Sequence, residues 1–314
     1  MSKINLSLPE SILIITGPTA CGKSSLALEV ADKFNGIIIN CDSMQVYNEL
    51  RVITSRPSVA DEANISHKLY GVISVEDFFS AGIWRSLVIA EIFSCWKAGK
   101  LPIITGGTGL YIKALMNGLT EIPEVSVYVR KEVIAYHKKI GADAFHRELR
   151  KFDPESAERL NKADSQRVIR AFEVYMATDR SLSDWHKRQP TTEPFSAHFQ
   201  SIVFEPPRDI LYAKCEERFD WMIENGALDE VRTLISLNLD PGHPPMKALG
   251  VPEIVEYLKG DRILEDACNA AKLATRHYAK RQMTWFRNQI VQNYSINAQY
   301  SNNISSKIFS DITR

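Results

Sequence analysis

Short apolar runs alternate with helix-like segments along the first third of the chain. Residues 11–16 (SILIIT), 36–40 (GIIIN) and 101–105 (LPIIT) are apolar runs of strand length. Between them, residues 24–34 and 84–98 place their apolar side chains at helical spacing. Strands that alternate with helices predict a parallel sheet in an α/β fold, and such sheets bind ligands at the carboxyl ends of their strands.

The pattern changes after Pro123. Residues 123–188 contain no strand-like run and many residues that favour helices. This stretch predicts an all-helical insertion into the α/β core. The expected domains are a catalytic core of residues 1–121 and 193–314 and a helical domain of residues 122–192.

The core pattern resumes after the insertion. Residues 201–205 (SIVFE) read as another strand, and helices are predicted at residues 208–225, 228–237 and 264–289. The tail after Asn293 is rich in Asn and Ser, so we expect it to be loosely held.

The composition is that of an ordinary globular protein. Apolar residues make up 45% and charged residues 24% of the 314 residues, which excludes a disordered or fibrous chain. No window approaches the roughly 18 consecutive apolar residues of a membrane span, and no signal peptide is recognisable. The five scattered cysteines form no Cys-x-x-Cys pair, so we expect neither disulfides nor a zinc site. These features predict a cytoplasmic protein with no membrane partner.

The formal net charge of zero conceals an asymmetry along the chain. Residues 271–314 hold seven basic residues and one acidic residue, whereas residues 1–270 hold 31 basic and 37 acidic ones. A local basic surface on a neutral protein can bind the phosphates of a nucleic acid. The alternative is a solvated helix face, and charge alone does not separate the two.

Residues 17–24 (GPTACGKS) form a phosphate-binding loop, or P-loop. They match G-x-x-x-x-G-K-[ST] between a predicted strand and a predicted helix, which is the required context. Backbone amides converge there on an anion at the helix N-terminus, Lys23 adds a positive charge, and the Ser24 hydroxyl is a ligand type for Mg²⁺. The motif predicts a bound diphosphate and leaves open an ATP kinase, a GTPase or a prenyl diphosphate enzyme.

Two further segments follow strands at the same edge of the sheet. Asp42 comes after the second strand and suits three roles: Mg²⁺ ligand, general base or helix N-cap. Residues 106–109 (GGTG) follow the third strand, where the glycines allow close backbone approach and Thr108 offers a hydroxyl.

The helix predicted at the C-terminal end mixes basic and aromatic residues. Such interleaving suits RNA, whose phosphates need cations and whose unstacked bases pack on aromatic rings. The alternative is that Trp285 and Phe286 belong to the core. At helical spacing one face holds Lys280, Thr284 and Arg287, and another holds Tyr278, Arg281 and Trp285.

Six motifs together resemble the tRNA dimethylallyltransferase (tRNA isopentenyltransferase) family. They are GPTACGKS at 17–24, INCDSMQVY at 39–47, TSRPS at 54–58, GGTGLY at 106–111, DSQR at 164–167 and TRHYAKRQMTWFR at 275–287. The resemblance extends over residues 11–290, and the combination of the second, fourth and sixth motifs is highly specific. No Cys/His zinc finger follows the basic helix, so the chain is similar to the bacterial type.

The resemblance implies a P-loop NTPase-like core that transfers a dimethylallyl group from dimethylallyl diphosphate to tRNA. The acceptor is the exocyclic N6 amine of the adenosine that is 3′-adjacent to the anticodon. The family pattern makes Asp42 the general base, gives Thr108 an orienting role and directs Arg218 to the phosphates. It also implies Mg²⁺ as cofactor, with Ser24 as a ligand. The implied diphosphate-binding residues are Gly17, Pro18, Thr19, Ala20, Cys21, Gly22, Lys23 and Ser24.

The family's second partner is the anticodon stem-loop of tRNA. The positions that match its tRNA contacts are Asp42, Ser43, Met44, Gln45, Thr108, Arg130, Gln166, Arg167, Val168, Ile169, Arg170 and Lys247, with Arg281 added from the basic helix. In the family the helical insertion packs against this stem-loop, and we expect the enzyme to be a monomer.

The sequence departs from the family pattern at a few positions. Ile53 stands where many members have glycine, Arg56 where they have lysine, and Lys214 where an arginine is common. Residues 250–252 (GVP) replace the more usual Gly-Tyr-Lys/Arg, so a basic contact to tRNA that follows Lys247 is missing.

Three other functions fit part of the pattern. An adenylate isopentenyltransferase would share the P-loop and Asp42 but act on free AMP, ADP or ATP, and the helical insertion disfavours it. A small-molecule P-loop kinase would need a pocket for the ATP base and a phosphoryl acceptor, and no pattern of lid arginines indicates one. A tRNA-binding module with a regulatory nucleotide site would not explain why Lys23, Asp42 and Thr108 meet at one sheet edge.

Overall fold

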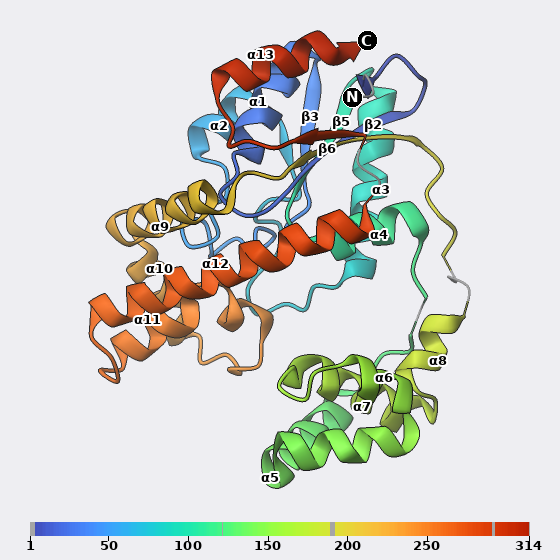
Figure 1. Cartoon of the computed structure of the whole chain (residues 1–314), viewed down its shortest axis with the longest axis vertical. Coiled ribbons are helices and arrows are strands. Elements are labelled where there is room, and N and C mark those ends of the chain that lie inside the picture. The colour runs from blue at the N-terminus through green and yellow to red at the C-terminus, as the bar shows by residue number, and fades with distance from the viewer. Residues whose placement is uncertain (1–3, 121, 189–191, 291–292, 314) are drawn as a thin grey trace. The chain divides into compact units, whose positions relative to one another are not determined.

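The computed structural model describes residues 4–120, 122–188, 192–290 and 293–313 (Figure 1). The chain divides into two compact units. Residues 1–116 and 196–314 form the first unit, and residues 117–195 form the second.

A parallel sheet forms the centre of the first unit. Among the described residues it has six strands in the order β4-β3-β5-β2-β6-β7 (Figure 1). β2 and β5 are buried along their whole length, which explains why their sequences are continuous apolar runs without alternation. The strands are β2 Ser11–Thr16, β3 Gly36–Asn40, β4 His67–Lys68, β5 Leu101–Gly106, β6 His198–Phe204 and β7 Tyr294–Ile296.

Helices cover the sheet and join its strands. Leu26 and Val30 of the first helix belong to the same buried cluster as Leu13 and Ile15 of β2, so alternate residues of that strand face this helix. None of the described helices is long and apolar enough to cross a membrane. The helices of this unit are α1 Lys23–Lys33, α2 Val59–Asn64, α3 Ala81–Lys97, α4 Gly109–Asn117, α9 Arg208–Glu224, α10 Ala227–Ser236, a 3₁₀ turn Pro244–Lys247, α11 Val251–Leu258 and α12 Leu264–Gln289.

These elements confirm the predicted fold class, an α/β core of the P-loop type. The predicted bounds of β2, β3 and α12 agree with the structure, whereas β6 begins at His198, three residues before the predicted strand.

The expectation of a loosely held tail after Asn293 is wrong. Tyr294 and Ile296 of β7 are buried, and helix α13 (Asn302–Asp311) buries Ile308 at 1% exposure. Strand β8 (Ile312–Thr313) then pairs in parallel with β1 (Ile4–Asn5). A few well-spaced apolar residues fix this segment to the core, although Asn and Ser dominate its composition.

All regular elements in the described residues of the second unit are helices. Its helices are α5 Val127–Phe152, α6 Pro154–Arg159, α7 Ser165–Thr178 and α8 Leu182–Lys187. Phe145 and Phe172 stack at 4.5 Å between ring centroids in its core. The buried Asp153 caps α6 by accepting from Ser156 N at 3.0 Å and also accepts from Ser183 N, at the start of α8, at 3.2 Å.

Candidate active site

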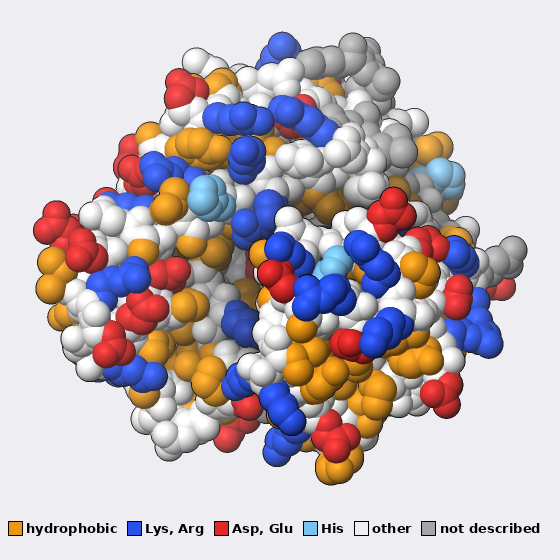
Figure 2. Space-filling view, turned by 60° about the horizontal axis from the view of Figure 1, so that its bottom comes forward, with side chains coloured by type: hydrophobic (Ala, Val, Ile, Leu, Met, Phe, Trp, Pro, Cys, Tyr) orange, Lys and Arg blue, Asp and Glu red, His pale blue; other side chains and the backbone are white. Residues whose placement is uncertain are grey.

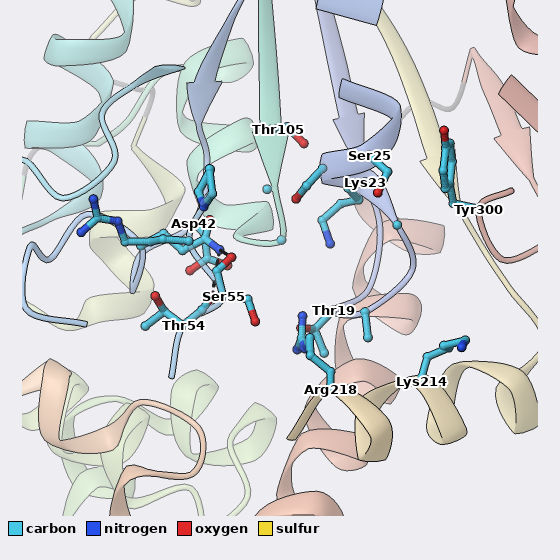
Figure 3. Close-up of a pocket in the computed structure, with 18 of the residues that line it drawn as sticks. Thr19, Lys23, Ser25, Asp42, Thr54, Ser55, Thr105, Lys214, Arg218 and Tyr300 are labelled. Carbon is cyan, nitrogen blue, oxygen red and sulfur yellow. Dashed lines mark hydrogen bonds between the residues drawn. The ribbon is translucent and has the colours of Figure 1, made fainter. Parts of the chain in front are cut away.

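A pocket of about 580 Å³ opens at the carboxyl ends of β2, β3 and β5 (Figure 3). Its wall comes from the P-loop, the segments that follow β3 and β5, helices α9 and α12, and the C-terminal tail. Of the residues that the sequence singled out, Thr19, Ala20, Gly22, Lys23, Ser24, Asp42, Gln45 and Arg218 line this pocket. All of these residues belong to the first unit.

The P-loop joins β2 to the N-terminus of α1. Lys23 is the first residue of α1, and its Nζ donates to the carbonyl oxygen of Pro18 at 2.7 Å. Figure 3 shows the Lys23 side chain extending into the pocket. The first amides of α1 and the positive end of its dipole lie at the same place, so the loop has the elements of an anion site.

Arg218 brings a second positive charge from α9. Its Nη2 donates to the Thr19 hydroxyl, and its buried Nε has no hydrogen-bond partner among the described residues. Burial lowers the pKa of the Arg218 guanidinium, yet an arginine keeps its proton at neutral pH. In the described part of the chain neither Lys23 nor Arg218 forms an ion pair with a carboxylate. Two unneutralised cations therefore lie at the P-loop end of the pocket.

Gln282 connects the P-loop to the GGTG loop. It is 6% exposed on α12, its Oε1 accepts from Thr19 N at 2.8 Å, and its Nε2 donates to Gly107 O at 2.9 Å. A Cβ at Gly107 would lie 2.2 Å from Gln282 Nε2, so glycine is required for this approach. No local sequence pattern indicates this role of Gln282, because its partners are remote along the chain.

Asp42 lies on a tight turn that Asn40 holds. Asn40 Oδ1 accepts from Asp42 N at 2.8 Å, and Asp42 Oδ1 in turn accepts from Met44 N at 2.9 Å. No helix follows Asp42, so the N-cap interpretation is wrong. Burial and the Asp42 charge together raise the pKa of Tyr70 and Tyr278, so both phenols stay protonated beside the carboxylate.

Thr108 joins the turn after β3 to the loop after β5. Its hydroxyl accepts from Ser43 N at 3.0 Å and lies 3.4 Å from Ser43 Oγ, while its own N–H donates to Cys41 O at 3.1 Å. Thr108 is not among the residues that line the pocket. Gly17, Pro18 and the buried Cys21 do not line it either.

Two side chains hold the TSRPS segment and the three residues that precede it. Gln45 Nε2 donates to Thr54 O at 2.9 Å and to Ser55 O at 2.8 Å. The Glu230 carboxylate of α10 accepts from the three successive amides of residues 51–53. Sequence reasoning missed Glu230, since nothing local to α10 indicates a partner in this loop.

The positions that depart from the family pattern are packed within the first unit. Ile53 is buried next to Gly250, and Val251 is fully buried at the start of α11. Arg56 donates to the carbonyls of residues 47 and 48, and Lys214 forms an exposed ion pair with Glu217.

Three of the seven basic residues of the C-terminal segment are paired with acidic residues of the first unit. Three ion pairs join Lys272 to Asp220 at 2.6 Å, Arg276 to Glu216 at 2.6 Å and Arg287 to Glu205 at 3.0 Å. Phe286 is in the core, and the half-buried Trp285 ring lies against the backbone of Gly109. Lys280 and Arg281 remain exposed. The core interpretation of these aromatic residues is therefore confirmed for Phe286.

Other positions expected to contact tRNA lie in the second unit or on the surface. Arg130 and Arg170 flank the buried Glu173 carboxylate at 3.5 and 3.7 Å, and burial raises the pKa of Glu173. Val168 is 1% exposed, so its side chain faces the core of this unit. Gln166, Arg167 and, in the first unit, Lys247 are exposed, and Ile169 is half-buried.

Comparisons with known proteins place the chain in one family. Residues 45–289 match the family model described as IPP transferase. A tRNA dimethylallyltransferase of Rhodospirillum centenum is 51% identical over 279 residues, which cover 89% of each chain. The chain belongs to the IPP transferase family.

Solved structures agree with this membership. A tRNA delta(2)-isopentenylpyrophosphate transferase of Staphylococcus epidermidis is 33% identical, covers 96% of this chain and 97% of its own, and superposes with a TM-score of 0.67. A eukaryotic dimethylallyltransferase described as acting on tRNA is 27% identical, with 88% of this chain and 70% of that one covered and a TM-score of 0.69.

Proposed function

We propose that this member of the IPP transferase family transfers a dimethylallyl group from dimethylallyl diphosphate to tRNA. The acceptor is the N6 amine of the adenosine 3′-adjacent to the anticodon. The observation that supports this is one pocket lined by a P-loop, two unneutralised cations and a carboxylate, in a chain whose relatives are named for this reaction.

In the proposed reaction the amine nitrogen attacks the allylic carbon of the donor. The carbon–oxygen bond breaks, and its electron pair leaves with the diphosphate. Asp42 takes the amine proton as the new carbon–nitrogen bond forms, which keeps a full positive charge from remaining on the base. The adenine has to leave its stack in the RNA to reach Asp42.

Negative charge grows on the diphosphate as the bond breaks. Lys23, Arg218 and the backbone N–H groups of residues 20–24 are fixed before the reaction, so they stabilise this charge without reorganising. Thr108 acts by fixing the turn that holds Asp42, through its bonds to Ser43 and Cys41.

Mg²⁺ fits this site as a partner of the diphosphate. The described residues contain no group of three His, Cys, Asp or Glu side chains arranged around a common metal position. Ser24 presents a hydroxyl to the pocket, which suits a Mg²⁺ ion held mainly by phosphate oxygens and water. When bound, the ion would neutralise part of the charge of the leaving diphosphate.

The proposed tRNA contacts involve both units. We assign them to the turn at residues 42–45 with Thr108, to Arg130 and residues 166–170 of the helical unit, and to Lys247 and Arg281. We further propose that the enzyme works as a monomer in the cytoplasm.

Incubation with radiolabelled dimethylallyl diphosphate tests the function. We expect label in unmodified tRNA and none in AMP, because the relatives are named for tRNA. Label that enters only AMP would identify an adenylate isopentenyltransferase. Robust ATP hydrolysis without transfer would instead indicate a kinase-like enzyme.

A further inference from the structure

The C-terminal tail contacts the P-loop directly. The segment between β7 and α13, residues 297–301, is here called the C-terminal strap. Gln299 and Tyr300 of this strap line the same pocket as Lys23 and Arg218 (Figure 3). The match to the family model ends at residue 289, so the strap lies outside it.

Three hydrogen bonds join the strap to the loop and to the helix that follows it. Gln299 Nε2 donates to Ala20 O at 2.8 Å, Tyr300 N donates to Cys21 O at 3.3 Å, and the Tyr300 hydroxyl donates to the Glu29 carboxylate on α1. The Gln299 amide has one possible orientation, because the Ala20 carbonyl only accepts.

The approach of the strap also explains a glycine of the motif. Gly22 has a φ of 93°, and a Cβ there would lie 2.2 Å from Tyr300 Cβ. Glycine is therefore needed at position 22 for two reasons: the backbone there is left-handed, and Tyr300 leaves no room for a side chain. The strap itself is anchored on both sides, by the buried Tyr294 and Ile296 before it and Ile308 after it.

These contacts orient two peptide groups of the P-loop. In a trans peptide the carbonyl oxygen and the next N–H point in opposite directions. The carbonyls of Ala20 and Cys21 face the strap, so the N–H groups of Cys21 and Gly22 face away from it. N–H groups oriented in this way are what an anion cradle requires.

We infer that the C-terminal strap is a positioning element of the diphosphate site, which holds the Ala20 and Cys21 peptides with their N–H groups directed toward the bound anion. Gln299 is the main positioning residue. Its side-chain bond to Ala20 O can be removed without changing the buried residues that anchor the tail. The inference rests on the proposed binding of the donor diphosphate at the P-loop.

The test measures binding of inorganic diphosphate to the full-length protein by calorimetry. Gln299→Met keeps the length of the side chain and loses its donor, so we expect the Kd to rise about fivefold, the value of one hydrogen bond. The Michaelis constant for dimethylallyl diphosphate should rise by a similar factor, with that for tRNA and the melting temperature unchanged. Asn297→Ala, an exposed strap residue whose amide oxygen faces Ser295, is the matched control and should bind as the wild type does.

A second variant covers the case in which Gln299→Met does not fold. Tyr300→Phe keeps the ring against Gly22 and loses only the bond to Glu29, and we expect about threefold weaker binding of diphosphate. Wild-type affinity in a folded Gln299→Met protein, or in Tyr300→Phe if the first variant is unfolded, would overturn the role of the strap. Failure of the wild type itself to bind diphosphate would instead overturn the proposed site.

Discussion

The Asp42 carboxylate has a structural role in the turn after β3, and the proposed function gives it a chemical role as general base. Its Oδ1 accepts from Met44 N, which shapes the turn after β3. An asparagine oxygen would accept the same bond, whereas only a carboxylate can take the proton of the reacting amine. The two roles are therefore separable by a single substitution.

Asp42→Asn should lower kcat for dimethylallyl transfer by about 10²- to 10⁴-fold, the usual contribution of a general base. Affinity for tRNA, measured by filter binding, should change little because the turn is preserved. Asp61→Asn is the control. Asp61 also lines the pocket, but its carboxylate is engaged with Ser58 in the capping box of α2. Retention of most of the rate in Asp42→Asn would remove Asp42 from the chemistry.

At the scale of elements, α12 acts as a clamp on two loops. Gln282 bonds the P-loop on one side and the GGTG loop on the other, while Trp285 lies against Gly109. The sequence motif that suits an RNA-binding helix thus also fixes the spacing between the P-loop and the GGTG loop. Its basic residues are partly neutralised, by Asp220 and Glu216 of α9 and by Glu205.

Gln282→Met should weaken both the fold and the reaction. It leaves Thr19 N and Gly107 O without their partner, at a cost of about 1–3 kcal/mol in the free energy of unfolding. We expect kcat/KM to fall about tenfold or more, because the P-loop and the GGTG loop lose the side chain that joins them. Gln289→Met on the same helix, an exposed residue bonded to Lys113, should leave both quantities unchanged. Equal activity of the two variants would contradict the clamp.

The elements that sequence reasoning found are those with local signals. The apolar runs of β2 and β3 and the helical spacing of α12 each lie within one stretch of chain. The bridge made by Gln282 spans 263 residues to Thr19, and no local pattern reports such a bond. The short strand β7 was missed for a different reason, because two buried residues are too few to stand out in a polar tail.

At the scale of the whole molecule, the distribution of charge along the sequence differs from its distribution over the folded surface. The C-terminal segment is strongly basic in sequence, but several of its cations are paired with acidic residues from other parts of the first unit. Figure 2 shows basic side chains interspersed with acidic ones over one face of the molecule. The proposed RNA contacts therefore depend on individual exposed residues such as Lys247 and Arg281 rather than on net charge.

The first and last described strands pair with each other in the first unit, so the C-terminal tail should contribute to stability. β8 pairs with β1, and Ile308 of α13 belongs to the same buried cluster as Leu26 of α1. Ile308→Ala should lower the free energy of unfolding by about 2–5 kcal/mol, as expected for a fully buried side chain. Lys307→Ala, exposed on the same helix, should change it by less than about 0.5 kcal/mol. Urea unfolding of both variants measures the difference, and an Ile308→Ala protein as stable as Lys307→Ala would mean that the tail is dispensable to the fold.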